Sequence, residues 1–399
     1  MQMAAFVGSA ALGCGEVRAR AASARTAPAA GRRTSRRAAA ALSMVTSAKP
    51  SRKMSTETSP VTLTRFIIEE GMENADLIHL KDMENLMAAI ALACKKISSL
   101  VARAGLSNLT GLEEGGGSIN VQGEEQKKLD VLSNEVLKNA LRFSGKMGIM
   151  ASEEEDKPVL VDELTSGSYI AVFDPLDGSS NIDANIATGT IFGIFEDNAE
   201  CLTQDWEDRI EERELQCMYG TMQPGTNLVA SGYCLYSSAC MLVLTFGNGV
   251  HGFTLDPTIG EFLLTHYDMK IPEDGKIYSF NEANEANWDP VMRDMLSRWK
   301  ERGYSSRYIG SMVGDVHRTL MYGGIFGYPG DKKNKTGKLR LLYEAAPMSH
   351  IIEQAGGVST TGTERIMDLN PQAVHQRVPV ILGSKNLVNE VVEAYKQAK

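Results

Sequence analysis

The sequence lacks the features that would place the chain in a membrane, in the secretory pathway or around a structural zinc ion. Its longest obvious apolar run, residues 241–246, is far shorter than the roughly 20 residues that a membrane-spanning helix needs. Its six cysteines include no CxxC pair, and no secretory signal precedes them. No internal repeat recurs at a period of roughly 20 to 50 residues. We therefore expect a soluble globular protein whose cysteines are mostly reduced.

Basic residues are concentrated in the first 60 positions, whereas the rest of the chain is acidic. Residues 1–60 hold ten Lys or Arg against two Glu, and residues 61–399 carry 31 basic and 48 acidic side chains. The acidic body argues against nucleic acid as a partner. Residues 1–58 are also rich in Ala, Ser and Thr without a sustained apolar face, which is typical of an organelle transit peptide. The alternatives are a disordered basic tail that stays attached and, for a transit peptide, a mitochondrial destination.

Patterns typical of helices and of strands alternate along residues 59–399. Apolar residues recur every three or four positions in several segments, which predicts helices near residues 62–70, 83–101, 126–143, 288–302 and 387–395. Short β-forming runs predict strands at residues 148–151, 169–173, 189–195 and 380–384, and a sheet over residues 223–265. Interleaved strands and helices predict a layered α/β fold. The chain length suggests two α/β halves, which we place at residues 59–260 and 261–399.

The stretch Tyr169–Asp183, YIAVFDPLDGSSNID, contains a predicted buried strand that is followed directly by carboxylate and hydroxyl side chains. We expect the strand to stop at Asp174-Pro175, so that Asp174 and Asp177 lie at its carboxyl end. The next residues, 178–180 (GSS), offer a backbone that a ligand can approach, together with hydroxyl groups and unpaired N–H groups. Carboxylates favour a hard cation and this turn favours an anion, which predicts a metal ion held against a phosphate. Taken alone, the motif is as compatible with an ordinary turn.

Two other acidic segments help to decide between a metal site and an ordinary turn. The run SEEED at residues 152–156 follows a predicted strand, and Glu344 lies in the mostly apolar and basic segment GKLRLLYEAAPMS. An acidic run is usually a solvated face. A lone Glu after Leu-Leu-Tyr, however, is costly to bury unless it meets positive charge. If these carboxylates converge with those of the DPLDG motif, the cluster needs cations.

Several longer motifs occur in a fixed order from residue 62 to the end of the chain. They are KKLDVLSN at 127–134, SEE at 152–154, FDPLDGSSNID at 173–183, RYIGSMVGDVHRTLMYGGIFGYP at 307–329 and GKLRLLYEAAPM at 337–348. In this combination the chain resembles the magnesium-dependent fructose-1,6-bisphosphatases, in particular their chloroplast form. The resemblance implies an α-β-α-β-α sugar-phosphatase fold. It also implies hydrolysis of fructose 1,6-bisphosphate to fructose 6-phosphate and phosphate in the plastid stroma, as part of the Calvin cycle.

The resemblance assigns the acidic residues to two roles. The positions that match the family's ligands for several Mg²⁺ ions per subunit are Glu153, Asp174, Asp177, Glu344 and the carbonyl group of Leu176. Asp130 and Glu154 match the carboxylates that orient and deprotonate the attacking water. The N-terminal half would thus be a regulatory-type half that carries the metal motifs.

The resemblance also assigns the substrate contacts. Gly178, Ser179 and Ser180 would hold the phosphate that is cleaved. Asn281, Tyr308, Tyr328 and Lys338 match the pocket for the sugar ring and the second phosphate, and Arg307 matches an arginine that reaches in from a neighbouring subunit of a homotetramer. The C-terminal half would therefore bind substrate. One position departs from the family, because Asn284 stands where a substrate-site tyrosine is usual, which puts one phosphate contact in doubt.

An acidic insertion at residues 196–222 resembles the redox loop of the chloroplast enzymes. The resemblance implies a regulatory disulfide between Cys201 and Cys217 that thioredoxin opens. Met222 replaces a third cysteine that chloroplast relatives typically carry, and two unrelated loop cysteines are the alternative.

Alternative functions are a sedoheptulose-1,7-bisphosphatase or a bifunctional bisphosphatase, an inositol-type monophosphatase, and a non-catalytic sugar-phosphate-binding or redox-interaction protein.

Overall fold

The computed structural model describes residues 54–73, 80–107, 109–111, 127–161, 167–197 and 218–398. These residues belong to one compact unit, which begins at Pro50. Nearly all of the predicted transit segment and the two cysteines of the acidic insertion, Cys201 and Cys217, lie outside the described residues. Among the helices within these ranges, none has the length and apolarity required to span a bilayer.

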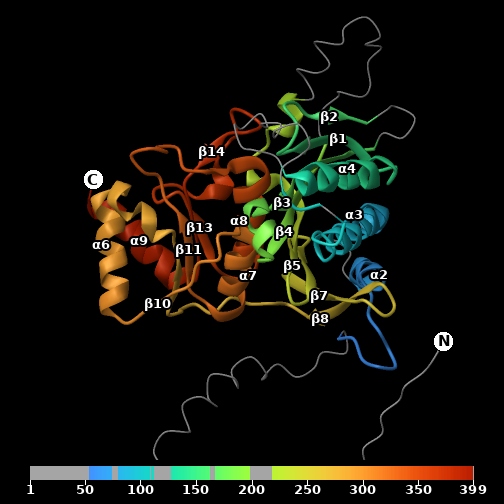
Figure 1. The fold of residues 1–399 in the computed structure, drawn as a ribbon, viewed down its shortest axis with the longest axis horizontal. Coiled ribbons are helices and arrows are strands. Elements are labelled where there is room, and N and C mark those ends of the chain that lie inside the picture. Colours follow the sequence, from blue (N-terminus) through green and yellow to red (C-terminus); the bar gives the residue numbers. More distant parts are fainter. Residues whose placement is uncertain are drawn as a thin grey trace, which may run out of the picture. The chain divides into compact units, whose positions relative to one another are not determined.

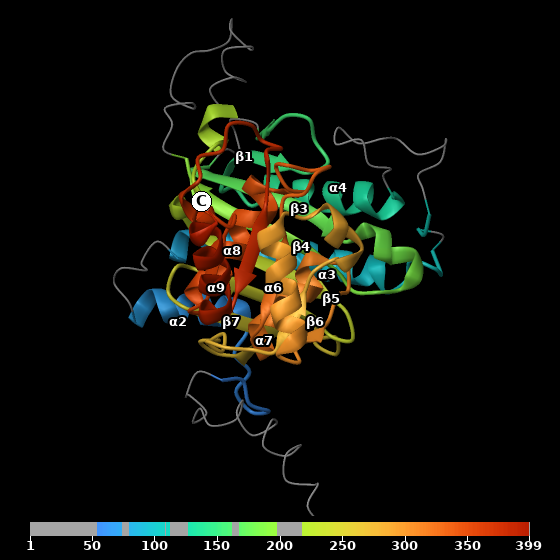
Figure 2. The same ribbon diagram turned by 90° about the vertical axis from the view of Figure 1, so that its left-hand side faces the viewer.

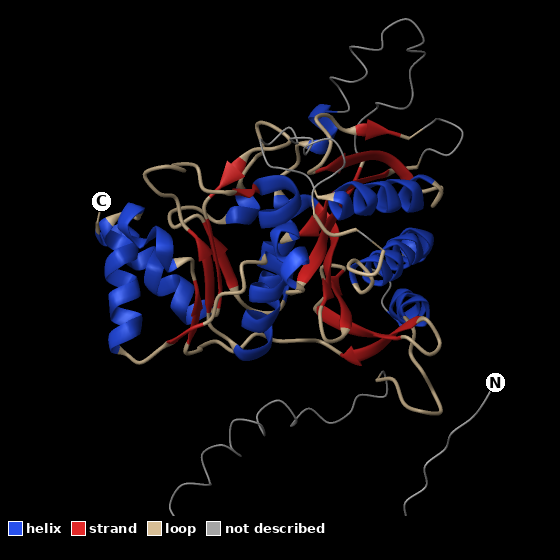
Figure 3. Ribbon diagram, viewed as in Figure 1, coloured by secondary structure: helices blue, strands red, loops and turns tan. Residues whose placement is uncertain are grey.

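Helices and sheets of the compact unit alternate in five layers (Figures 1 and 3). The first layer contains α2 (Leu63–Glu73), α3 (Leu80–Val101) and α4 (Lys128–Arg142). A large sheet follows, then α7 (Met312–Tyr322) and α8 (Ala346–Gln354), then a smaller sheet. The last layer is α6 (Pro290–Glu301) and α9 (Lys385–Gln397). Figure 2, turned by 90°, looks onto this outer pair of helices. The predicted α-β-α-β-α layering is confirmed.

The large sheet has the strand order β2-β1-β3-β4-β5-β6-β7-β8. Its strands are β1 (Met147–Ser152), β2 (Val159–Leu160), β3 (Tyr169–Asp177), β4 (Thr188–Glu196), β5 (Leu228–Tyr236), β6 (Cys240–Thr245), β7 (Val250–Asp256) and β8 (Glu261–His266). Only the β1–β3 pair is parallel among these strands. The carboxyl ends of β1 and β3 therefore meet at one edge, with Ser152 opposite Phe173.

The smaller sheet has the order β10-β9-β11-β15-β13. Its strands are β9 (Ile277–Ser279), β10 (Ser305–Ser306), β11 (Ile325–Tyr328), β13 (Val358–Thr360) and β15 (Val380–Gly383), and a separate pair joins β12 (Leu339–Arg340) to β14 (Arg377–Val378). The change from one sheet to the other thus falls between His266 and Ile277. The division at residues 260 and 261 stays a prediction.

Apolar side chains fill the spaces between the layers in three clusters. The first lies between α2–α4 and the large sheet, the second around α7 and α8, and the third between the small sheet and α6 with α9. The amphipathic patterns predicted from the sequence supply the first and third clusters. The sequence analysis predicts no helix at α7, most of whose residues are buried.

The predicted end of the Tyr169 strand is wrong. We expected it to end at Asp174, but β3 continues to Asp177. Asp174 pairs with Ile191 and Asp177 with Gly189, so one extra residue is accommodated on β3 as a β-bulge. Pro175 lies in this bulge, where the missing N–H costs no ladder hydrogen bond. The bulge places both carboxylates at the end of a continuous, buried strand.

Candidate active site

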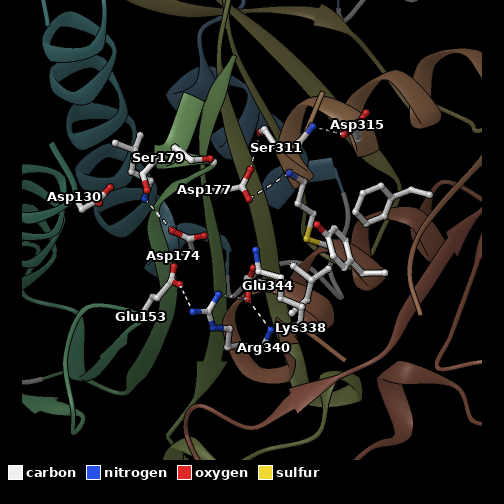
Figure 4. A pocket seen from close by; sticks show the side chains of 18 of the residues that line it. Asp130, Glu153, Asp174, Asp177, Ser179, Ser311, Asp315, Lys338, Arg340 and Glu344 are labelled. Carbon is white, nitrogen blue, oxygen red and sulfur yellow. Dashed lines mark hydrogen bonds and ion pairs between the residues drawn. The ribbon is translucent and has the colours of Figure 1, made fainter. Parts of the chain in front are cut away.

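A cavity of about 180 Å³ opens where the ends of β1 and β3 meet α7 and the segment 338–344 (Figure 4). Most of the residues that the sequence assigns to metal, water or substrate line it. They are Asp130, Glu153, Glu154, Asp174, Leu176, Asp177, Gly178, Ser179, Ser180, Tyr308, Tyr328, Lys338 and Glu344. Segments that lie more than 200 residues apart in the chain thus converge on one space.

Three buried carboxylates form the acidic centre of the cavity. Asp174, Asp177 and Glu344 each offer an oxygen atom within 4.8 Å of the others. Asp174 and Asp177 come from the β3 bulge, and Glu344 comes from a single π-helical turn, η6 (Leu341–Ala345), that leads into α8. This spacing suits one hard divalent cation, whose oxygen ligands lie at about 2.0 to 2.6 Å from the ion.

The amino-terminal end of α7 holds the Asp177 carboxylate. Ser311, the residue before the helix, donates from Oγ to Asp177 Oδ2 at 2.7 Å. The N–H groups of Met312 and Val313 donate to the same carboxylate at 3.3 and 3.0 Å. A helix amino terminus carries unsatisfied N–H groups and partial positive charge, which stabilise an anion. Gly178 permits this contact, because a Cβ atom there would lie 2.8 Å from Ser311 Cβ and its φ is +74°.

Arg340 brings positive charge to the other side of the cavity. Its guanidinium lies 2.9 Å from Glu153 Oε1 and 3.7 Å from Glu344 Oε2, and the backbone N–H of Arg340 donates to Glu344 Oε2 at 2.6 Å. All three side chains are buried. Loss of one partner of a buried ion pair is strongly destabilising, so Arg340 stabilises the buried carboxylates of Glu153 and Glu344.

The pKa values of the buried carboxyl groups are raised. Burial, followed by the charges of Glu153, Asp177 and Glu344, raises the pKa of Asp174 well above its usual value. Burial raises the pKa of Glu344 to about 8, although the charge of Arg340 opposes the shift. The pKa of Asp177 is also raised by burial, against its hydrogen bonds from α7. The cluster is therefore short of positive charge, and a divalent cation would relieve this shortage.

Asp130 and Glu154 lie beside this centre. Asp130 occupies the first turn of α4, where its Oδ2 accepts a hydrogen bond from the Lys127 N–H at 2.8 Å. Burial raises the pKa of Asp130 to about 7, and the charge of Glu154 adds to the shift. A carboxylate with a pKa near neutrality is suited to accept a proton from water.

The opposite end of the cavity carries neutral and cationic donors. The hydroxyl groups of Tyr308 and Tyr328 lie 2.8 Å apart, and Lys338 Nζ lies 5.8 Å from the centre of the Tyr328 ring. Lys338 is exposed, so its ammonium group is available to an anion. This end suits a polar ligand that carries a second negative group.

Two predicted substrate residues do not line the cavity of the single chain. Asn281 caps the 3-10 helix η5 (Glu282–Asn287), because its Oδ1 accepts a hydrogen bond from the Ala283 N–H at 3.2 Å. Arg307 is exposed and donates to the carbonyl group of Ser306 at 2.8 Å. The role predicted for Arg307 is in a neighbouring subunit, so both assignments stay predictions.

Sequence reasoning missed Ser311, Arg340 and Asp315. Ser311 begins the pattern Ser-x-x-x-Asp at the start of α7, a helix-start signal. Arg340 precedes Glu344 by four residues, a spacing that a helical turn brings together. Asp315 accepts hydrogen bonds from the N–H groups of Ile309 and Gly310, and it pairs with Arg318. It therefore holds the loop that carries Tyr308.

Comparisons with known proteins agree with this geometry. The family model described as Fructose-1-6-bisphosphatase, N-terminal domain, matches residues 61–267, and the corresponding C-terminal domain matches residues 271–396. Chloroplastic fructose-1,6-bisphosphatase from Spinacia oleracea is 55% identical over 342 residues, 84% of this chain and 81% of that protein. Fructose-1,6-bisphosphatase 1, chloroplastic, from Arabidopsis thaliana is 54% identical over 341 residues, 84% and 80% of the two proteins.

Solved structures give the same result for the fold. The holo form of Leishmania major fructose-1,6-bisphosphatase is 42% identical and superposes with a TM-score of 0.77, covering 85% of this chain and 99% of that one. The apo form is 40% identical with a TM-score of 0.70 and the same coverage.

The contact between α7 and Asp177 generates a prediction. Ser311→Ala removes one hydrogen bond to the buried carboxylate and the cap of α7, so we expect a loss of about 1 to 2 kcal/mol of unfolding free energy. We also expect weaker divalent-cation binding, because Asp177 loses its orientation. Urea unfolding and a cation titration followed by thermal shift measure the two effects. Ser297→Ala, on the exposed face of α6, is the matched control and should change neither. Cation binding unchanged in Ser311→Ala would contradict the assigned role.

Proposed function

The chain belongs to the fructose-1,6-bisphosphatase family, and we propose on this premise that it hydrolyses fructose 1,6-bisphosphate to fructose 6-phosphate and phosphate. Its relatives from plants bear the name chloroplastic, and the chloroplast is its place of action, where the reaction serves the Calvin cycle. The observation that carries the proposal is the buried cluster of Asp174, Asp177 and Glu344 directly beside the GSS turn. It joins a cation site to an anion site within one cavity.

The donor set of the cavity fits divalent cations, which the family generally uses. We propose several Mg²⁺ ions as the cofactor, held by Glu153, Asp174, Asp177, Glu344 and the carbonyl group of Leu176. All of these ligands are oxygen atoms, which Mg²⁺ prefers. When bound, the metal neutralises the charge of the phosphate and the leaving oxygen and lowers the pKa of water.

The side chains around the metal ligands supply binding and proton transfer. Ser179 and Ser180, with the Gly178 backbone, hold the phosphate that is cleaved, at the start of the 3-10 helix η2 (Ser179–Ala184). Asp130 and Glu154 orient the attacking water, and Asp130, whose pKa is about 7, accepts its proton at neutral pH.

The far end of the cavity fixes the rest of the substrate. Tyr308 and Tyr328 bind the sugar ring or the second phosphate, and Lys338 offers it a positive charge. Asn281 and the Arg307 side chain of a neighbouring subunit complete this end in a homotetramer. The substrate is thereby held with its 1-phosphate on the acidic centre.

Isosteric removal of a carboxylate tests the metal assignment. We expect Asp174→Asn and Glu344→Gln each to lower phosphate release from fructose 1,6-bisphosphate at least about a hundredfold under saturating Mg²⁺, because each change removes a charged ligand. Phosphate release is measured for this substrate and for sedoheptulose 1,7-bisphosphate, with circular dichroism to verify folding. Glu390→Gln, in an exposed ion pair with Arg302, is the control and should keep full activity. Near-normal turnover in a folded Asp174→Asn protein would refute the assignment.

We propose further that a disulfide between Cys201 and Cys217 regulates this activity and that thioredoxin opens it. Both cysteines lie outside the described residues, but β4 ends at Glu196, next to the insertion that contains them. The same strand pairs with β3 up to the bulge that carries Asp174 and Asp177. A change at the insertion can therefore act on the metal site through one strand.

A comparison of oxidised and reduced protein tests this regulation. We expect reduced thioredoxin to raise phosphate release several-fold at limiting Mg²⁺, and the variant Cys201→Ser to be active without reduction. Mass spectrometry of alkylated peptides follows the redox state of the pair. Equal activity before and after reduction of a disulfide that is demonstrably present would count against the proposal.

A further inference from the structure

A pair of cysteine thiols lies in the core behind the active site, outside the acidic insertion. Cys234 on β5 and Cys240 on β6 have their Sγ atoms 3.5 Å apart. In the register of these strands, Cys240 lies opposite Tyr236 and Cys234 lies opposite Leu242, so both cysteines point to the same face of the sheet. That face packs against α3, whose Cys94 is next to Cys234. The spacing is that of a thiol hydrogen bond, so the two sulfur atoms are in direct contact.

The two thiols differ in access to solvent. Cys234 is fully buried, whereas Cys240 is half-buried and directly follows the exposed hairpin loop 237–239. Burial raises the pKa of the Cys234 thiol, so Cys234 stays protonated. Hydrogen bonding from Cys234 lowers the pKa of Cys240. The accessible sulfur is therefore the more nucleophilic one, and a second sulfur lies next to it.

We propose that Cys234 and Cys240 are a second oxidation site, which a hydroperoxide converts to a reversible disulfide. The Cys240 thiolate attacks the peroxide, forming an S–O bond as the O–O bond breaks and an alcohol or water leaves. The Cys234 sulfur then attacks the Cys240 sulfur. The S–S bond forms, the S–O bond breaks, and the hydroxide leaves as water with the Cys234 proton. The peroxide is reduced by two electrons, and the two thiols are oxidised.

Formation of this disulfide would shift the residues that hydrogen-bond to the backbone between the proposed metal ligands Asp174 and Asp177. The sulfur atoms must approach from 3.5 Å to about 2.05 Å, which displaces β5 and β6 relative to each other. Tyr236, the last residue of β5, lies directly opposite Cys240 on β6. Its hydroxyl oxygen is 2.7 Å from Thr190 Oγ1, and Thr190 Oγ1 donates to the Pro175 carbonyl at 2.8 Å.

This chain of hydrogen bonds leads to the bulge between Asp174 and Asp177. Thr190 has one hydroxyl proton, which goes to Pro175, so Tyr236 donates to Thr190. All of these side chains are buried, so no water replaces a lost contact cheaply. We therefore infer that the disulfide weakens cation binding. This consequence depends on the proposed function, whereas formation of the disulfide does not.

The experiment uses the full chain with Cys201→Ser and Cys217→Ser, so that the two cysteines of the acidic insertion cannot respond. The protein is treated with hydrogen peroxide, the remaining thiols are alkylated, and the linked peptides are identified by mass spectrometry. Mg²⁺ binding is measured by thermal shift, which requires no catalytic activity. We expect a Cys234–Cys240 link, an apparent Mg²⁺ dissociation constant raised at least about threefold, and reversal of both by dithiothreitol.

Three variants separate the possible outcomes. Cys240→Ser should keep Mg²⁺ binding unchanged after peroxide. Thr190→Val, without any oxidant, should weaken Mg²⁺ binding as the disulfide does, whereas Thr190→Ser, which keeps the hydroxyl group, should not. A link between Cys94 and Cys234 instead, or oxidation of Cys240 without a link, would overturn the site. A Cys234–Cys240 link with unchanged Mg²⁺ binding would overturn its coupling to the bulge.

Discussion

The burial of several carboxylates in one small space is the constraint on which the rest of this structure depends. Asp174, Asp177 and Glu344 lie within reach of a single ion, and water is largely excluded from them. Buried carboxylates repel one another and lose hydration, so the fold must supply compensation or bind a cation. The fold supplies part of this compensation through the amino terminus of α7 and the guanidinium of Arg340. The remaining deficit of positive charge is the reason we propose that the cavity binds divalent cations.

The elements around the cavity position the carboxylates of this cluster. The parallel pair of β1 and β3 brings Glu153 beside Asp174, and the bulge at Pro175 turns the end of β3 toward α7. The π-helical turn before α8 directs Glu344 inward. Behind the bulge, Thr190 and Tyr236 fix the backbone from the core of the sheet. A displacement of the strands of the sheet can therefore move the carboxylates through these few hydrogen bonds.

The sequence predicts the layered architecture, and its motifs name most of the residues that line the cavity. Amphipathic patterns locate α3 and α4, and motif order identifies the carboxylates. The strand end at Asp174 was mispredicted, because Pro ordinarily interrupts a strand and a bulge depends on the partner strand. Ser311 and Arg340 were missed because their importance lies in tertiary contacts with Asp177 and Glu153. The roles of Asn281 and Arg307 depend on contacts with a bound ligand or with a neighbouring subunit, and the fold of a single chain includes neither.

Calorimetric titration of the protein with Mg²⁺ at pH 6.5 and 8.5, in buffers of different ionisation enthalpy, tests the central claim most directly. Burial raises the pKa of Glu344, a proposed metal ligand, to about 8, so this carboxyl group is largely protonated at pH 6.5 and a cation must displace its proton. We predict affinity about tenfold or more higher at pH 8.5, with proton release on binding at pH 6.5. Equal affinities at the two pH values without proton release would contradict the account.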